Sequence, residues 1–162
     1  MTLADLQRAA RGRVALALAL LVASAALLAS PLRGHVDDTD AQLYQALSRN
    51  MAARGAWLEP GPSPGSPYPF REHLPFGLWP QVAVVRILGE GALFVPGLVF
   101  SAGTVLLVFL LGARLTSARA GAAAALLLAL NETFFLYEAR PRLDPPLVFF
   151  ALLAAAPALL GR

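Results

Sequence analysis

The sequence predicts an all-α integral membrane protein with about four transmembrane helices and an extracytoplasmic first loop that carries short amphipathic helices. Two observations lead to this fold class. Hydrophobic residues make up 57% of the 162 residues and charged residues only 14%, which lies outside the usual range of soluble domains. In addition, several apolar runs approach the length that crosses the hydrocarbon core of a bilayer.

The four expected spans are apolar segments separated by charged or proline-containing ones. They cover about residues 14–31, 92–112, 119–137 and 145–160, and they leave residues 32–91 as a long loop. The first run follows several arginines, as a signal sequence also does, but it is longer than the usual apolar core of a signal. Residues 75–88 are too few to span, so we expect them to lie in the membrane interface with Trp79 at headgroup depth.

Arginine placement predicts the orientation. A cytoplasmic amino terminus puts the arginines before residue 14 inside, together with Arg114 and Arg119, as the positive-inside rule prefers. Residues 32–91 and the loop that holds Arg140 and Arg142 then face outwards. The abundant Ala, Gly and Pro and the absence of lysine suggest a GC-rich genome, so we expect a multi-pass protein of a bacterial inner (plasma) membrane.

Composition also excludes several functions. Without cysteine the chain has no disulfide framework and no thiolate nucleophile. Its isoelectric point is near 10.2, but the arginines are scattered between apolar runs and do not form a stripe with interleaved aromatic residues. We therefore expect no nucleic-acid partner.

The segment that follows the first apolar run, "TDAQLYQALSRNMAARG", predicts an amphipathic helix. Thr39 and Gln42 suit a capping box, Gly55 suits the end of the helix, and one face carries Leu43, Tyr44, Leu47 and Met51. Asp40 falls in the first turn, where it can simply complement the helix dipole. Alternatively, the helix holds this carboxylate at the water–lipid boundary, where a lipid-borne substrate meets an aqueous one. Asp37 and Asp38 precede the expected helix, and we expect them to matter little.

Three motifs, in order along the chain, are similar to those of a known family. The first consists of Asp40, Tyr44, Met51, Gly55 and Trp57, and the second is "FREHLPFGLW", in which Phe70, Glu72, Pro75, Phe76 and Trp79 match in position or type. The third is "RLDPPL", residues 142–147. With these motifs the chain resembles the GT-C glycosyltransferases that use polyprenyl-phosphate sugars, namely the protein O-mannosyltransferases and the lipid A aminoarabinose transferases.

The chain also departs from the family pattern. Ala41 stands where the family has a second acid, His73 where it has lysine, and Leu74 where it has the first proline. The resemblance extends only to the amino-terminal part of such enzymes. We therefore expect the further spans to come either from a continuation of the reading frame or from a second polypeptide, and we expect no transferase activity from this chain alone.

The resemblance implies inverting transfer of a sugar from a polyprenyl-phosphate donor to an extracytoplasmic acceptor. Asp40 would be the base, with Asp144 as a second catalytic carboxylate, and the substrate-binding residues would be Tyr44, Arg71, Glu72, His73, Arg140 and Arg142. Arginine suits the leaving phosphate because its guanidinium matches phosphate oxygens bidentately.

No Gly-rich nucleotide-binding loop is present, which agrees with a lipid-linked donor and with membrane lipid as a partner. A divalent metal ion stays an open alternative, because Glu72 and Asp144 offer carboxylates but no histidine ligand accompanies them. A second function also stays open: a non-catalytic four-span membrane subunit or scaffold that is inactive alone.

Overall fold

A computed structural model describes residues 38–63, 65–66, 68–137 and 140–161, together with residues 12, 14–17, 19–20, 22–24 and 26. The span expected over residues 14–31 therefore lies partly, and Asp37 wholly, outside the described residues. The α-helices in the rest of the chain are α2 (Thr39–Arg54), α3 (Trp79–Leu88), α4 (Val95–Leu115), α5 (Ala118–Ala129), α6 (Glu132–Tyr137) and α7 (Asp144–Leu160). The same part of the chain contains two short 3-10 helices, labelled η, which are η2 (Pro75–Gly77) and η3 (Glu90–Ala92). No strand occurs among the described residues, so the all-helical fold class is confirmed.

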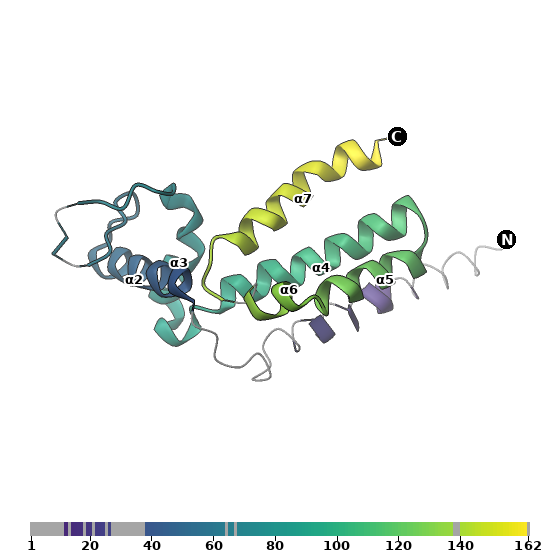
Figure 1. The fold of residues 1–162 in the computed structure, drawn as a ribbon, viewed down its shortest axis with the longest axis horizontal. Coiled ribbons are helices and arrows are strands. Elements are labelled where there is room, and N and C mark those ends of the chain that lie inside the picture. The colour runs from purple at the N-terminus through teal and green to yellow at the C-terminus, as the bar shows by residue number, and fades with distance from the viewer. Residues whose placement is uncertain are drawn as a thin grey trace.

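Helices α4 and α5 form an antiparallel hairpin, and α7 lies along the other side of α4 (Figure 1). Glycine allows the close approach of α4 and α5. A Cβ added at Gly121 would press on the carbonyl oxygen of Phe109 and lie 2.6 Å from the amide nitrogen of Ala113. The hairpin core contains Val105, Phe109, Ala125, Ala129 and Phe134.

The expected third span, residues 119–137, is not one helix. It divides into α5 and α6 at Leu130 and Asn131. The side-chain oxygen of Asn131 accepts a hydrogen bond from the amide of Phe134 at 3.1 Å, which satisfies a backbone donor at the start of α6. Asparagine favours such helix starts over helix interiors, and the apolar run therefore breaks at this residue.

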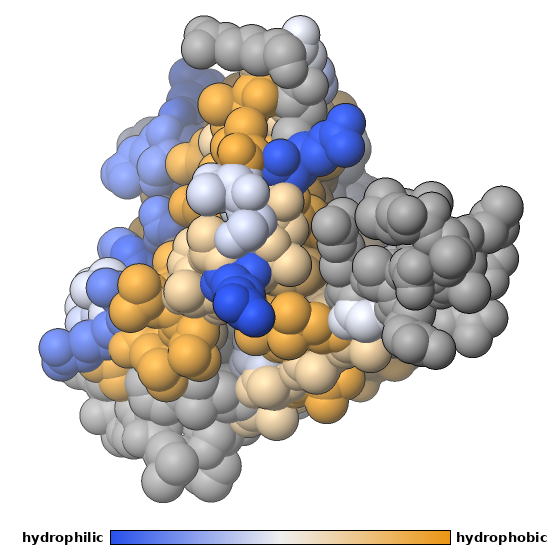
Figure 2. Space-filling model, turned by 90° about the vertical axis from the view of Figure 1, so that its right-hand side faces the viewer, coloured by the Kyte–Doolittle hydropathy of each residue, from blue (hydrophilic) through white to orange (hydrophobic). Residues whose placement is uncertain are grey.

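One helical stretch among the described residues is long and apolar enough to cross a membrane: Glu90–Leu115, with 26 residues. The other apolar helices, Pro75–Leu88, Ala118–Ala129 and Asp144–Leu159, are shorter than the roughly 20 residues that a span needs. Four spans are thus not shown. Large apolar side chains are nevertheless exposed on α4, α5 and α7, and hydrophobic residues cover much of the end of the molecule that Figure 2 presents.

Helices α2 and α3 pack against each other at one end of the molecule (Figure 1). As the sequence predicts, Tyr44, Leu47 and Met51 are buried, and they contact Leu78 and Val82. Helix α2 ends at Gly55, whose φ of 68° lies in the left-handed region that favours glycine. The residues that the sequence expects in the interface form η2 and α3, which meet at Leu78 in one short helical stretch, Pro75–Leu88.

The predicted capping box at Thr39 is wrong. The cap of α2 is Asp38, whose Oδ1 accepts a hydrogen bond from the amide of Ala41 at 3.0 Å, while Thr39 is the first helical residue and is exposed. Both residue types cap helices well, so local preference does not choose between them. Asp38 has a further partner on a distant segment, and that partner decides the choice.

Candidate active site at the junction of α2 and α7

The site is organised around Arg142, which precedes α7. Its guanidinium contacts three carboxylates: Nε donates to Asp144 Oδ2 at 2.9 Å, Nη2 to Asp40 Oδ2 at 3.2 Å, and Nη1 lies 3.4 Å from both oxygens of Asp38. Asp38 and Asp40 begin α2 and stand more than 100 residues before Arg142 (separations of 104 and 102). The structure therefore brings together the first and third sequence motifs.

The three carboxylates differ in burial. The side chain of Asp38 is only 4% exposed, whereas those of Asp40 and Asp144 are 57% and 52% exposed. A buried carboxylate needs both a charge partner and hydrogen bonds, and Asp38 obtains them from Arg142 and from its own helix. Asp38 is therefore the structural anchor, and Asp40 is an open carboxylate beside the same cation. The sequence did not predict this burial and pairing of Asp38.

Polar contacts hold the Arg142 backbone in place. Gln81 on α3 donates through Nε2 to the carbonyl oxygen of Arg142 at 3.2 Å, and its own Oε1 accepts from Ser48 on α2 at 2.9 Å. The Arg142 guanidinium lies 5.3 Å from the ring centre of Tyr137. Burial opposes the charge of Arg142, but the hydrogen bond to Asp144 and the charges of Asp38 and Asp40 outweigh this effect and raise the pKa of the guanidinium. The cation is therefore permanent.

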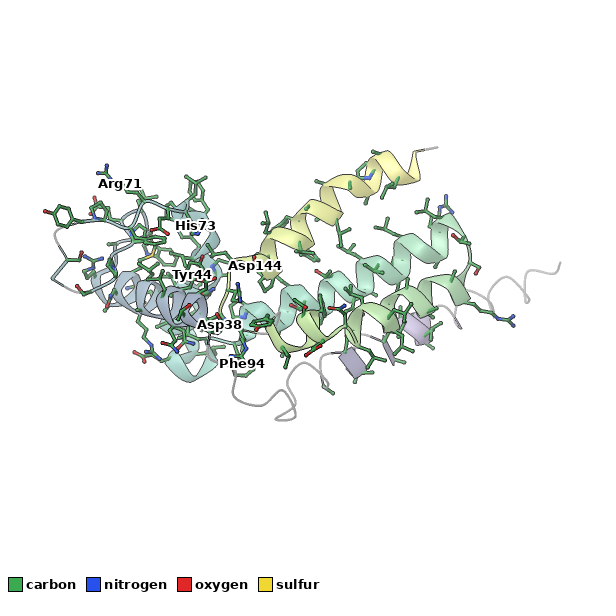
Figure 3. All side chains as sticks on the ribbon, in the orientation of Figure 1. Asp38, Tyr44, Arg71, His73, Phe94 and Asp144 are labelled. Atoms are coloured by element: carbon green, nitrogen blue, oxygen red, sulfur yellow. The ribbon has the colours of Figure 1, made fainter. Side chains whose placement is uncertain are left out.

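The second motif reaches the same region through a hydrogen bond. The hydroxyl of Tyr44, one turn after Asp40 on α2, lies 3.0 Å from Nε2 of His73. Burial raises the pKa of Tyr44, and the nearby carboxylates of Asp40 and Asp144 raise it further, against the smaller opposite effect of Arg142. Tyr44 is thus a neutral hydroxyl at physiological pH. Figure 3 shows that His73, Tyr44, Asp38 and Asp144 all lie in the region where α2 meets the start of α7.

The remaining predicted site residues lie around this centre. Glu72 is exposed beside His73 and lines an apolar cavity of about 630 Å³, whose wall includes Leu143 and Phe150. Arg71 is exposed on the far side of His73 and lines a second cavity. Arg140 donates through Nε to the carbonyl oxygen of Leu136 at 2.7 Å and shares the Tyr137 ring, at 6.0 Å, with Arg142.

Within the described part of the chain, no three His, Asp or Glu side chains come close enough together to hold a metal ion. Glu72 and Asp144, the carboxylates considered for a divalent ion, belong to no such group there.

Sequence reasoning missed three contributors to the site: Asp38, Gln81 and Tyr137. A signal existed for Gln81, because it is the one polar side chain between Trp79 and Val85 and needs a partner if it is buried. Asp38 also had a signal, since aspartate directly before a helix is a common cap. Nothing in the sequence marked Tyr137, because an aromatic residue near the end of an apolar run is ordinary.

Compared with known proteins, the chain matches no protein-family model, no curated protein and no solved structure.

Proposed function

We propose that this protein is a membrane glycosyltransferase, or a part of one, that transfers a sugar from a polyprenyl-phosphate donor to an extracytoplasmic acceptor with inversion. One observation carries the proposal. Asp40 of the first motif and Asp144 of the third contact the same guanidinium, and Tyr44 brings His73 of the second motif alongside. Segments that resemble the family separately thus meet at one place, as residues that share a site must.

In this proposal Asp40 accepts the proton of the acceptor hydroxyl or amine. The freed electron pair attacks the anomeric carbon, the carbon–oxygen bond to the phosphate breaks on the opposite face, and polyprenyl phosphate leaves with that bond's electrons. Asp40 suits this role for two reasons. Its side chain is exposed to an incoming acceptor, and the contact with Arg142 holds the Asp40 carboxylate in one position. Arg142 itself is a positioning residue, since three carboxylates already occupy its donors.

The leaving phosphate needs cations that are not engaged elsewhere. Arg71 and His73 are the candidates: neither contacts a carboxylate among the described residues, and Arg71 lines a neighbouring cavity whereas His73 lines the apolar cavity beside α7. Leu147 and Phe150 line that cavity and are 67% and 55% exposed, so an apolar lipid chain can lie against them. The arrangement accommodates an amphipathic donor with its phosphate near His73 and its chain along α7.

The arrangement of helices also agrees with the proposed orientation in the membrane. The Arg142 cluster lies at one end of α4 and α7, and the turn between α4 and α5, which is flanked by Arg114 and Arg119, lies at the other (Figure 1). In a membrane-spanning arrangement the site would face outwards and these arginines would face the cytoplasm.

The test is Asp40→Asn, which keeps the size of the side chain and removes the base. In native membranes that contain the chain with its partners, donor turnover is followed as release of polyprenyl phosphate from labelled polyprenyl-phosphate mannose or aminoarabinose. We expect turnover to fall by roughly a hundredfold or more, the scale of losing a general base. The thermal midpoint should change little, because a half-exposed ion pair contributes only about 0–1 kcal/mol.

The matched control is Glu90→Gln, which removes an exposed carboxylate that pairs with Arg49 at 2.9 Å, away from the site. Full turnover by the Asp40→Asn membranes would show that this carboxylate is only a partner of Arg142 and of the helix dipole. Equal losses in both variants would point to a general charge effect and would also refute the catalytic assignment.

A second function is favoured by a separate observation, the saturation of Arg142. A guanidinium held by three carboxylates ties α2 to α7, as the non-catalytic subunit or scaffold requires. Under this alternative, Asp40→Asn leaves turnover in the assembly unchanged, while loss of Arg142 lowers the amount of assembled complex. The two functions therefore predict opposite outcomes in the same membranes.

A further inference from the structure

A second cavity, of about 570 Å³, lies on the side of His73 away from α7. Its lining includes Arg54 at the end of α2, and Tyr68, Phe70 and Arg71 from the loop that follows. This cavity does not include the Arg142 cluster, and it shares only His73 and Leu74 with the apolar cavity described above. Its volume is within the range of small-molecule sites, roughly 300–1,000 Å³.

The loop that forms the cavity wall is tied to the last turns of α2. Asn50 donates through Nδ2 to the carbonyl oxygen of Gly61 at 3.0 Å, and Arg54 donates through Nη2 to that of Glu59 at 3.2 Å. Farther along, the amide of Phe70 donates to the carbonyl oxygen of Pro60 at 2.6 Å. These bonds hold both sides of the cavity in place before any ligand arrives, which lowers the entropic cost of binding.

At Gly61 the loop passes close to the guanidinium of Arg54. A Cβ at this position would lie 2.6 Å from Nη2 of Arg54. The loop backbone therefore borders the guanidinium of Arg54 at the cavity wall, and a larger residue at position 61 would displace only the movable end of that side chain.

The charges of the lining favour an anion. Arg54 bonds only to backbone carbonyl oxygens, those of Asn50 and Glu59, and Arg71 has no hydrogen-bond or ion-pair partner within the described part of the chain. Neither guanidinium is thus neutralised there by a carboxylate. Glu59 also lines the cavity and opposes an anion, so the two arginines leave one net positive charge.

We propose that this cavity binds a small water-soluble anion, a carboxylate- or phosphate-bearing molecule, between Arg54 and Arg71. Guanidinium groups match both kinds of anion through paired hydrogen bonds. Tyr68, which is 79% exposed, and Phe70 provide flat surfaces for the apolar part of the ligand. The cavity shares Arg71 and His73 with the phosphate position proposed above, but binding of a water-soluble anion there does not require the transfer reaction.

Binding is measured on the purified full chain in a neutral detergent at low ionic strength, where surface charges are least screened. The probes are inorganic pyrophosphate and citrate, in separate isothermal titrations, with intrinsic tryptophan fluorescence as a second readout. Fluorescence suits the site because Trp57 directly precedes Leu58 of the lining, and the chain has 2 tryptophans. We expect saturable binding of at least one probe, and the stronger probe identifies which anionic group the site prefers.

Three variants test the position of the site. Arg71→Gln and Arg54→Gln should each weaken binding about tenfold or more, the loss expected when a charge-assisted hydrogen-bonded pair is removed. Arg71→Gln removes no intramolecular bond, so the result does not depend on loop folding. Glu59→Gln should strengthen binding severalfold, because it removes the opposing carboxylate. Arg49→Gln is the matched control: it removes an arginine from the same helix outside the cavity, and binding should stay within about twofold of the wild type.

Failure of wild-type chain to bind either probe overturns the proposal, and so does an equal loss in Arg49→Gln and Arg71→Gln. A cavity that binds anions while Asp40→Asn keeps full turnover supports this site and refutes the catalytic assignment of Asp40. The converse, turnover that needs Asp40 without any anion binding, refutes this site alone.

Discussion

Replacing Arg142 by methionine should produce a defect that a second substitution, Asp38→Asn, partly repairs. Methionine keeps much of the apolar stem of arginine and removes its charge, so packing changes little. The variant leaves three carboxylates at the junction of α2 and α7 without their cation. Only Asp38 is buried, and it therefore carries most of the cost.

The magnitude follows from burial. Removing one partner of a buried ion pair costs about 3–5 kcal/mol, mainly because the other charge stays desolvated. Arg142 is 21% exposed, which places this pair at the lower end, near 3 kcal/mol. Losing the contacts to Asp40 and Asp144 adds about 0–1 kcal/mol each, because their side chains are more than half exposed.

Asparagine at position 38 still caps α2 but carries no charge. In the Arg142→Met background, Asp38→Asn should therefore restore about 2 kcal/mol, most of the penalty for an unpaired buried charge. In the wild-type background the same substitution should instead destabilise the protein by about 1 kcal/mol. It removes the attraction between Asp38 and Arg142, and the loss is small because the desolvation cost of the Asp38 charge disappears as well. The sign of the effect thus reverses between the two backgrounds.

The assay is reversible unfolding in detergent micelles, followed by tryptophan fluorescence from Trp57 and Trp79, both near α2 and α3. Asp144→Asn serves as the control in both backgrounds. It removes an exposed carboxylate from the same guanidinium, so its recovery in the Arg142→Met background should not exceed about 1 kcal/mol. Equal recovery by the two asparagine variants would refute the reasoning, because it would mean that the burial of Asp38 does not set the cost.

Three further predictions concern other parts of the chain. Burial raises the pKa of Tyr44, and the carboxylates near it raise this pKa further. The stability that depends on the neutral hydroxyl is therefore complete below pH 10.0, the ordinary pKa, and is lost as the pH rises through the folded-state pKa. Tyr44→Phe should reduce this alkaline loss of stability, measured by thermal unfolding between about pH 9 and 11. Gly121→Ala should destabilise the α4–α5 hairpin by about 1–3 kcal/mol in the same assay, because the two backbones must separate. The control is Gly91→Ala, which should be nearly neutral because the space around its Cβ is open. A Gly121→Ala variant as stable as the wild type would contradict the close approach. Because the chain has no cysteine, single cysteines can report the orientation. A membrane-impermeant maleimide should label Thr39→Cys from outside intact cells and Arg119→Cys only after permeabilisation. Labelling of both positions from one side would rule out the proposed orientation.

Much of the local structure could be predicted because it depends on spacing along the chain. The period of Tyr44, Leu47 and Met51 determines which face of α2 is buried, and the structure confirms it. Gly55 ends this helix because its backbone adopts a positive φ without a steric penalty. The apolar run over residues 92–112 lies, apart from its first three residues, within α4, which begins at Val95.

The break between α5 and α6 was missed for a different reason. Hydropathy averages over a window and does not register a single residue such as Asn131, whose side chain competes for a backbone amide. Hydropathy also cannot distinguish a helix that faces lipid from one that faces a protein core, since both are apolar. The number of spans therefore could not follow from the apolar runs alone.

The sequence by itself determined an all-helical chain of unusually apolar composition, the buried face and the end of α2, and the order of three motif segments, because each is a property of neighbouring residues. Only the tertiary structure decided that Asp38, and not Thr39, caps α2, and that Asp40 and Asp144 share a cation. These choices depend on Arg142, which stands 104 residues after Asp38. The free energy of a buried carboxylate is set by the charges that packing brings near it, and no local pattern contains that information.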